Sequence, residues 1–283
     1  MQRHIEQLTN VKVVRRNVVL ALLGSITLAS SFIIFAPVEK KTFYSDIIEP
    51  TSTAIAAGLS LVVVYRQKLD GLIGKAYLSL AIALLLWLTA EVIWSYYETG
   101  LGIPIPTPSL ADAFWLIGYG PFMYYVFKIY NFFHKSASKP YVIVVISLAA
   151  AIYLAYIVNT TLAASDLSTQ GSILRFVVNI AYPISDMILI VPTSLVILES
   201  RRKHGVGDLT SIPWVFMSFL IVTIADSGFA YASNSGWSEQ VIWIWSPLYI
   251  AGYLVAAAGL YWHNHFFIFD EKKVVRKWQE QNR

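Results

Sequence analysis

Cysteine is absent from this sequence of 283 residues, and charged side chains make up only 13% of it. Without cysteine, the chain forms no disulfide, no thiolate metal site and no thiol nucleophile. The five histidines lie in loops or near the ends of apolar segments, which argues against haem or a histidine-rich metal site between those segments. Phosphate-loop, nucleophile-elbow and zinc-protease motifs are also missing, so we expect a protein that is not an enzyme.

Apolar residues dominate what is present: 57% of the chain is hydrophobic, and the mean hydropathy is +0.59. A helix needs about 20 mostly apolar residues to cross a bilayer. The runs lack the alternation of barrel strands, and backbone in lipid must satisfy its own hydrogen bonds, so we predict an all-α membrane protein. Its eight expected spans are 17–37, 47–65, 73–97, 110–133, 141–163, 173–198, 211–233 and 242–267. The last two spans contain no lysine for a Schiff base, which argues against a retinal protein.

The distribution of basic residues predicts the orientation in the membrane. Of the 21 Lys and Arg residues, 18 lie in the termini or in and next to the connections that follow even-numbered spans, and only Lys40, Lys41 and Arg175 lie towards the other side. Basic residues gather on the cytoplasmic side, so we expect a multi-pass protein of the cell membrane with both termini in the cytoplasm. The pI of about 9.1 then reflects topology and does not indicate nucleic-acid binding.

The two halves of the chain share short motifs in the same order at an offset of 133 to 135 residues. The paired motifs are Pro50-Thr51-Ser52 with Pro183-Ile184-Ser185, Ser60-Leu61-Val62 with Ser194-Leu195-Val196, Ala90-Glu91 with Ala225-Asp226, and Gly118-Tyr119 with Gly252-Tyr253. They predict a tandem repeat of four plus four helices. The expected parts are a basic cytoplasmic segment 1–16, repeats at 17–134 and 135–269, and a basic cytoplasmic tail 270–283.

Five acidic residues fall within or at the start of the expected spans, where a charged side chain is costly and indicates function by default. Glu91 and Asp226 occupy matching positions of the two repeats in the outer halves of their spans. Asp112 opens its span from the outside, and Asp186 lies about halfway along its own. Glu49 is expected at the interface only. The sequence thus predicts an acidic centre in the outer half of the membrane.

Aromatic residues gather at the same level: Trp94, Trp115, Tyr119, Tyr249 and Tyr253. Carboxylates among aromatic faces suit an organic cation, and their oxygens equally suit a hard metal ion. The same residues also fit purely structural roles. The rings are typical of an interfacial belt, and the acids could pair with Arg175, tyrosine hydroxyls or backbone. Ser109 and Asp112 form a helix-capping pattern that would explain Asp112 by itself.

Two segments resemble a known class of membrane sensor: PSLADAFWLIGY at 108–119 and YPISDMIL at 182–189. Together with Ala225-Asp226, Trp245 and Ala251-Gly252-Tyr253, they look like the polytopic sensor regions found ahead of diguanylate cyclase, phosphodiesterase and histidine kinase domains. The resemblance covers most of residues 45–265. It implies a membrane-embedded sensing module whose signal leaves through the last helix. The 283 residues carry no output domain, so we expect a separate protein partner.

We therefore expect an integral membrane sensor or ligand-binding module with an outward-facing acidic and aromatic site. Its partners would be the lipid bilayer, a small cationic ligand and a signalling protein in the membrane or cytoplasm. Two other functions fit the same features. Tandem repeats with acids in the membrane are also typical of small-solute or proton-coupled transporters. A structural subunit of a larger membrane complex would fit the small size of the chain.

Overall fold

The computed structural model describes residues 2–69, 71–103, 106, 108–133, 140–164, 168–202, 212–234 and 243–266. Within these residues the fold is entirely helical, as the sequence predicts, and strands are absent from them. The long helices are α1 (Gln2–Ile34), α2 (Val38–Gln67), α3 (Gly71–Ser95), α4 (Leu110–Phe133), α5 (Pro140–Ala164), α6 (Gln170–Arg202), α7 (Ile212–Asn234) and α9 (Ser246–Phe266). A π-helical turn, η1 (Tyr96–Gly100), follows α3, and a 3-10 turn, η3 (Trp243–Trp245), precedes α9.

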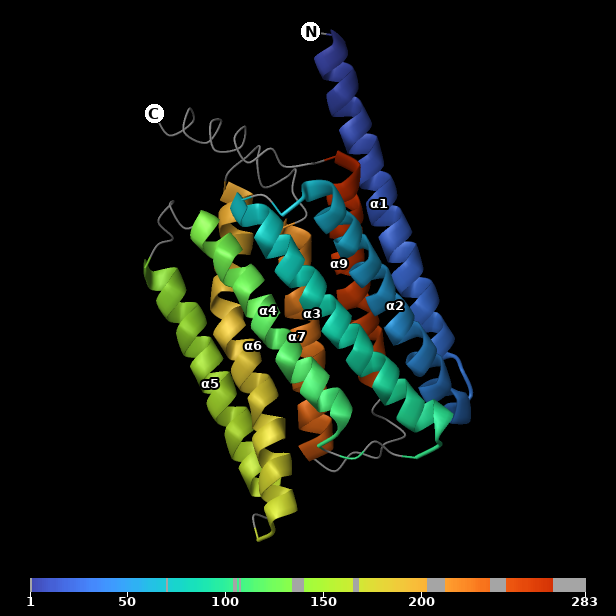
Figure 1. Cartoon of the computed structure of the whole chain (residues 1–283), viewed down its shortest axis with the longest axis vertical. Coiled ribbons are helices and arrows are strands. Elements are labelled where there is room, and N and C mark those ends of the chain that lie inside the picture. Colours follow the sequence, from blue (N-terminus) through green and yellow to red (C-terminus); the bar gives the residue numbers. More distant parts are fainter. Residues whose placement is uncertain are drawn as a thin grey trace.

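The helices run alternately up and down, so the start of α1 and the end of α9 lie at the same end of the bundle (Figure 1). We call this the terminal end. The opposite end, where α3 and α7 finish and α4 and α9 begin, is called the cavity end. Residues 1, 203–211 and 267–283 lie outside the described part, so the whole of the expected basic tail, 270–283, lies outside it. The side of the membrane on which each end lies stays a prediction.

Seven of the described helical segments are long and apolar enough to cross a membrane: those of α1, α2, α3, α5, α6, α7 and α9. The ends of α4 match its expected span, but this helix is not among the seven. It carries Asp112, Lys128 and several Trp and Tyr residues, which lower its hydropathy. It nevertheless lies alongside the others, packed between α3 and α6. Few side chains in residues 16–34 of α1 and 142–163 of α5 are buried, and most of them are exposed, as expected of helices that face lipid.

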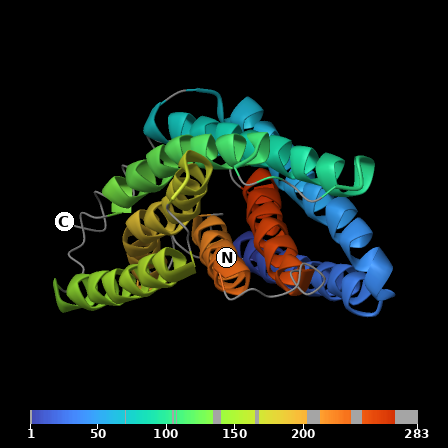
Figure 2. The same ribbon diagram turned by 90° about the horizontal axis from the view of Figure 1, so that it is seen from below.

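The core forms where α2, α3 and α4 curve around α9 and α7 (Figure 2). Small residues allow α2 and α9 to approach each other: Ala56 and Ala57 belong to the same buried cluster as Ala256 and Ala257. Larger side chains fill the remaining space towards the terminal end: Tyr77, Tyr125, Ile129, Phe216 and Leu260 are almost completely buried there.

Two glycines permit the closest helix crossings of the bundle. A Cβ atom on Gly118 of α4 would lie 2.5 Å from Nε1 of Trp87 on α3. A Cβ atom on Gly252 of α9 would lie 2.5 Å from Cγ2 of Val222 on α7. Contacts this short would force the Trp87 or Val222 side chain to move, so glycine fits best at either crossing. The motif Gly-Tyr that repeats in the sequence therefore has a packing role in both halves.

The substitution Gly118→Ala should destabilise the protein by about 1–3 kcal/mol, because the added methyl group overpacks the contact with Trp87. The matched control is Gly120→Ala in the same helix, where nothing lies within 4 Å of the new Cβ. Alanine is favoured over glycine in a helix by about 1 kcal/mol, so the control should be neutral or stabilising. Thermal unfolding in detergent measures both. Equal thermal unfolding midpoints for the two variants would contradict the close contact between Gly118 and Trp87.

Candidate functional site

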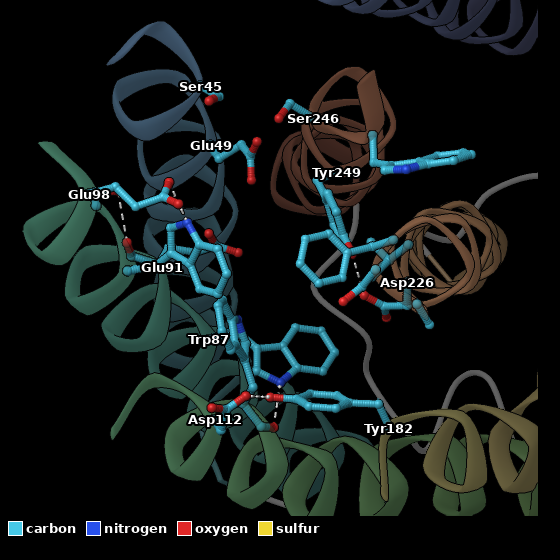
Figure 3. Close-up of a pocket in the computed structure, with 18 of the residues that line it drawn as sticks. Ser45, Glu49, Trp87, Glu91, Glu98, Asp112, Tyr182, Asp226, Ser246 and Tyr249 are labelled. Carbon is cyan, nitrogen blue, oxygen red and sulfur yellow. Dashed lines mark hydrogen bonds between the residues drawn. The ribbon is translucent and has the colours of Figure 1, made fainter. Parts of the chain in front are cut away.

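A cavity of about 550 Å³ lies at the cavity end of the bundle. Its walls come from α2, α3, η1, α4, α6, α7, η3 and α9 (Figure 3). Pro106, in the connection between α3 and α4, and Trp243 of η3 also line it, so the cavity reaches the connections at this end. Its volume falls in the range of small-molecule binding sites, which are about 300–1,000 Å³.

The cavity is strongly acidic. Six carboxylates line it: Asp46, Glu49, Glu91, Glu98, Asp112 and Asp226. Among the lining residues, Arg175 is the single basic side chain. Low-dielectric walls that carry charge of one sign attract a ligand of the opposite sign. The lining of the cavity therefore has a large excess of acidic over basic side chains, which cations or protons can neutralise.

Tyrosine hydroxyls from other helices hold the two carboxylates that the repeat singles out. Tyr253 of α9 donates a hydrogen bond of 2.9 Å to Oε1 of Glu91 on α3. One turn earlier on α9, Tyr249 donates at 2.7 Å to Oδ1 of Asp226 on α7. A buried polar group without a partner would cost several kcal/mol, so these donors help to make the acids tolerable in the bundle. They also tie α9 to both α3 and α7.

Two more carboxylates are held in the same way. Tyr182 of α6 donates to Oδ1 of Asp112 at 2.7 Å, and Tyr119 of α4 donates to Oδ1 of Asp186 at 2.7 Å. The two bonds run in opposite directions between α4 and α6. Asp186 is buried behind the cavity wall and does not line the cavity, whereas its partner Tyr119 does.

The capping role expected of Asp112 is confirmed. Its Oδ2 accepts hydrogen bonds from the backbone nitrogen and the hydroxyl of Ser109, at 2.6 and 2.9 Å. The Ser109 hydroxyl accepts in turn from the Asp112 backbone nitrogen at 3.3 Å. This reciprocal pattern is a capping box. Since the other carboxylate oxygen of Asp112 binds Tyr182, this residue both caps α4 and lines the cavity.

Asp46 and Glu98 lie nearer the connections of the cavity end. The Thr99 hydroxyl donates to Oδ2 of Asp46 at 2.5 Å, and Nε1 of Trp94 donates to Oε2 of Glu98 at 2.8 Å. The backbone oxygen of Asp46 accepts a bond of 2.8 Å from the Ser95 hydroxyl. Proline has no N–H, so Pro50 leaves this oxygen without its usual helical donor, and Ser95 takes that place.

Aromatic rings form the wall between these acids. The ring of Trp94 lies 5.5 Å from that of Trp115 and 6.2 Å from that of Phe229, measured between centroids. Trp87 also lines the cavity, and its Nε1 donates a hydrogen bond of 3.1 Å to the Trp115 backbone oxygen. Ring faces carry partial negative charge and attract cations. The wall thus complements the same class of ligand as the carboxylates do.

The arrangement does not favour the metal alternative. In the part of the chain that the structure describes, no group of three or more His, Asp or Glu side chains is placed to hold a metal ion. The acids are instead spread around the cavity and are held individually by hydroxyl and indole donors (Figure 3). An extended organic cation could contact several of them at once, whereas one metal ion could not.

Eight of the nine residues predicted from the sequence line the cavity: Glu91, Asp226, Asp112, Trp94, Trp115, Tyr119, Tyr249 and Tyr253. The ninth, Asp186, lies behind it, bonded to Tyr119. Their role in binding stays a prediction. Glu49, which was expected at the interface only, also lines the cavity, where it lies opposite Ser246 (Figure 3).

The polar lining residues that were not predicted as site residues include Asp46, Glu98 and Tyr182. A signal existed for the first of these, because Asp46 precedes Glu49 by three residues, and this spacing places both on one face of a helix. Glu98 carried no comparable signal, since its position depends on the π-helical turn that continues α3.

Comparisons of this chain with protein-family models, with curated proteins and with solved structures find no match. The geometry of the cavity is therefore the basis on which its function is inferred.

Replacing Tyr253 by Phe should lower the stability by about 1.5–3 kcal/mol, the usual range for a hydrogen bond to a charged group. The control is Tyr65→Phe, since the Tyr65 side chain is 86% exposed near the end of α2. Thermal midpoints in detergent are compared for the two variants. A midpoint of Tyr253→Phe equal to that of the control would show that Glu91 does not depend on this donor.

Proposed function

We propose that this chain is a multi-pass membrane sensor that binds a small organic cation in the acidic cavity. The observation that carries the proposal is the excess of six lining carboxylates over one arginine in a cavity of ligand size. The aromatic wall of Trp94, Trp115 and Phe229 supports it. The resemblance of the segments 108–119 and 182–189 to membrane sensor regions agrees with this function.

In this proposal the cavity faces the outside of the cell and both termini face the cytoplasm, with α4 as the eighth span. The basic residues at the cavity end are few, which favours the outer side for that end. Lys41, one of them, is buried: its Nζ donates to the Ile34 backbone oxygen at 2.9 Å and lies 3.5 Å from the Trp243 ring centroid. Only Arg175 brings a positive charge into the cavity wall.

A tandem repeat of four plus four helices is part of the proposal, and pairs of equivalent contacts support it. A Cβ on Gly118 would lie 3.5 Å from the Ala83 backbone oxygen, and a Cβ on Gly252 would lie 3.3 Å from that of Ser218. Gly252 follows Gly118 by 134 positions, and Ser218 follows Ala83 by 135 positions. Across the halves, Tyr253 bonds to Glu91, and the equivalent Tyr119 also interacts with Asp226.

The last helix is the proposed route of the signal. Tyr249 and Tyr253 connect α9 to the carboxylates on α7 and α3. At the terminal end of α9, the Asn264 backbone oxygen accepts a hydrogen bond from Arg66, and Nδ1 of His263 lies 3.3 Å from the Tyr77 hydroxyl. A cation that competes for Glu91 or Asp226 would change the tyrosine bonds and shift α9 relative to its neighbours. A separate protein would read this shift.

Native mass spectrometry of gently solubilised protein tests the binding function. The wild type should carry a small bound mass that is lost in Glu91→Gln/Asp226→Asn, since each lost charged hydrogen bond weakens binding about 10- to 100-fold. The control is Glu39→Gln, an exposed acid at the start of α2 outside the cavity, which should retain the mass.

Three outcomes would contradict the sensor. A bare chain in every sample would make the acids structural. A heteromeric assembly of fixed stoichiometry, with no small mass, would favour the structural-subunit function. Flux of a cation into liposomes that stops in Asp186→Asn would favour a transporter.

Single cysteines test the orientation, because the natural chain contains none. Leu101→Cys, exposed at the cavity end, should react in intact cells with a maleimide that cannot cross the membrane. Leu69→Cys, exposed between α2 and α3, should react only after the cells are permeabilised. The reverse pattern would place the cavity on the cytoplasmic side.

A further inference from the structure

The carboxylates of the cavity lie at two depths. Asp46 and Glu98 form an outer group near the connections, where Ser95 bonds to the Asp46 backbone and Thr99 to its side chain. Glu49 and Glu91 form an inner group: Glu49 lies about one helical turn further along α2 than Asp46, and Glu91 lies about two turns before Glu98 on α3 and η1. Asp226 of α7 lines the same cavity (Figure 3). The lining carboxylates are therefore spread along the depth of the cavity.

The distance between the groups sets the length of the ligand. Glu91 and Glu98 are seven residues apart on α3 and its continuation η1. At 1.5 Å per residue they are separated by about 10 Å along the helix axis. Two ammonium groups on one ligand would need a spacing of this order to pair with both levels at the same time.

The wall between the two levels is aromatic. Trp94 lies between Glu91 and Glu98 in sequence, and its rings pack near those of Trp115 and Phe229. Its Nε1 already donates to Glu98, so the apolar ring surface is what remains for a ligand. An alkyl chain along this wall would bury apolar area without leaving a polar group unpaired. The rings of Trp115 and Phe229 are tilted by 54° and 76° relative to Trp94.

We propose that the ligand is a linear aliphatic polyamine, with one ammonium group at Glu91 and Asp226 and another at Glu98 and Asp46. This inference rests on the proposed function and specifies its ligand class. The several positive charges of a polyamine match the excess of carboxylates, and its methylene chain matches the aromatic wall.

Isothermal titration of the full chain in detergent tests the ligand class. The probes are the triamine spermidine, the monoamine n-butylamine and the quaternary cation tetraethylammonium. Spermidine should bind at least about tenfold more tightly than either single-charge probe, because it gains a second charged contact. Glu98→Gln should weaken spermidine by about tenfold and weaken n-butylamine by less, because only the triamine needs both groups of carboxylates at once. This variant keeps an oxygen that can accept the Trp94 hydrogen bond, and Glu39→Gln is the matched control for charge.

The possible outcomes distinguish failure of the polyamine proposal from failure of the proposed cation-binding function. If either single-charge probe binds as tightly as spermidine, or if Glu98→Gln weakens all probes equally, the polyamine proposal fails while the cation sensor stands. If no probe binds to the folded wild type, both fail. Thermal midpoints near that of the wild type establish that Glu98→Gln and Glu39→Gln are folded.

Discussion

Each carboxyl group in the interior of this helical bundle needs a hydrogen-bond donor, and tyrosines on other helices supply four of those donors. The bonds to Glu91, Asp112, Asp186 and Asp226 cross between different helices, and three of them join residues at least 67 positions apart. They satisfy the acids and at the same time fix how α3, α4, α6, α7 and α9 are placed around the cavity. The alternative that tyrosine hydroxyls pair with the acids, left open by the sequence, is therefore confirmed, and it coexists with a cavity onto which three of these carboxylates open.

The two ends of the bundle differ in what fills them. Towards the terminal end, close packing of aromatic and aliphatic side chains leaves a dense core. At the cavity end, the bulky indoles stand against the wall, and the acidic side chains point inward (Figure 3). Glycine at the two crossings allows α4 and α9 to lie close to α3 and α7 just below the carboxylates. Since α9 contacts both the acids and Arg66 at the far end, movement at the cavity has a direct physical connection to the other end of the bundle.

Length and hydropathy were sufficient to predict the long helices, and the ends of α4 at Leu110 and Phe133 were predicted without error. The acids at the matching positions Glu91 and Asp226 were found because charge within an apolar run is costly and therefore conspicuous. Tyr182 was not found, because a tyrosine in an apolar helix is unremarkable until its partner is known. Asp46 was missed although its spacing from Glu49 placed both on one face of a helix. Glu98 was missed because its place depends on the π-helical turn, which hydropathy does not encode.

The most direct test is an experimental structure of the full chain determined with spermidine present. The account predicts elongated density along Trp94, with one end beside Glu91 and Asp226 and the other beside Glu98, and hydrogen bonds from Tyr249 and Tyr253 that differ from those of the unliganded protein. A cavity that is empty or filled by a lipid chain at saturating spermidine, with the tyrosine bonds unchanged, would contradict it.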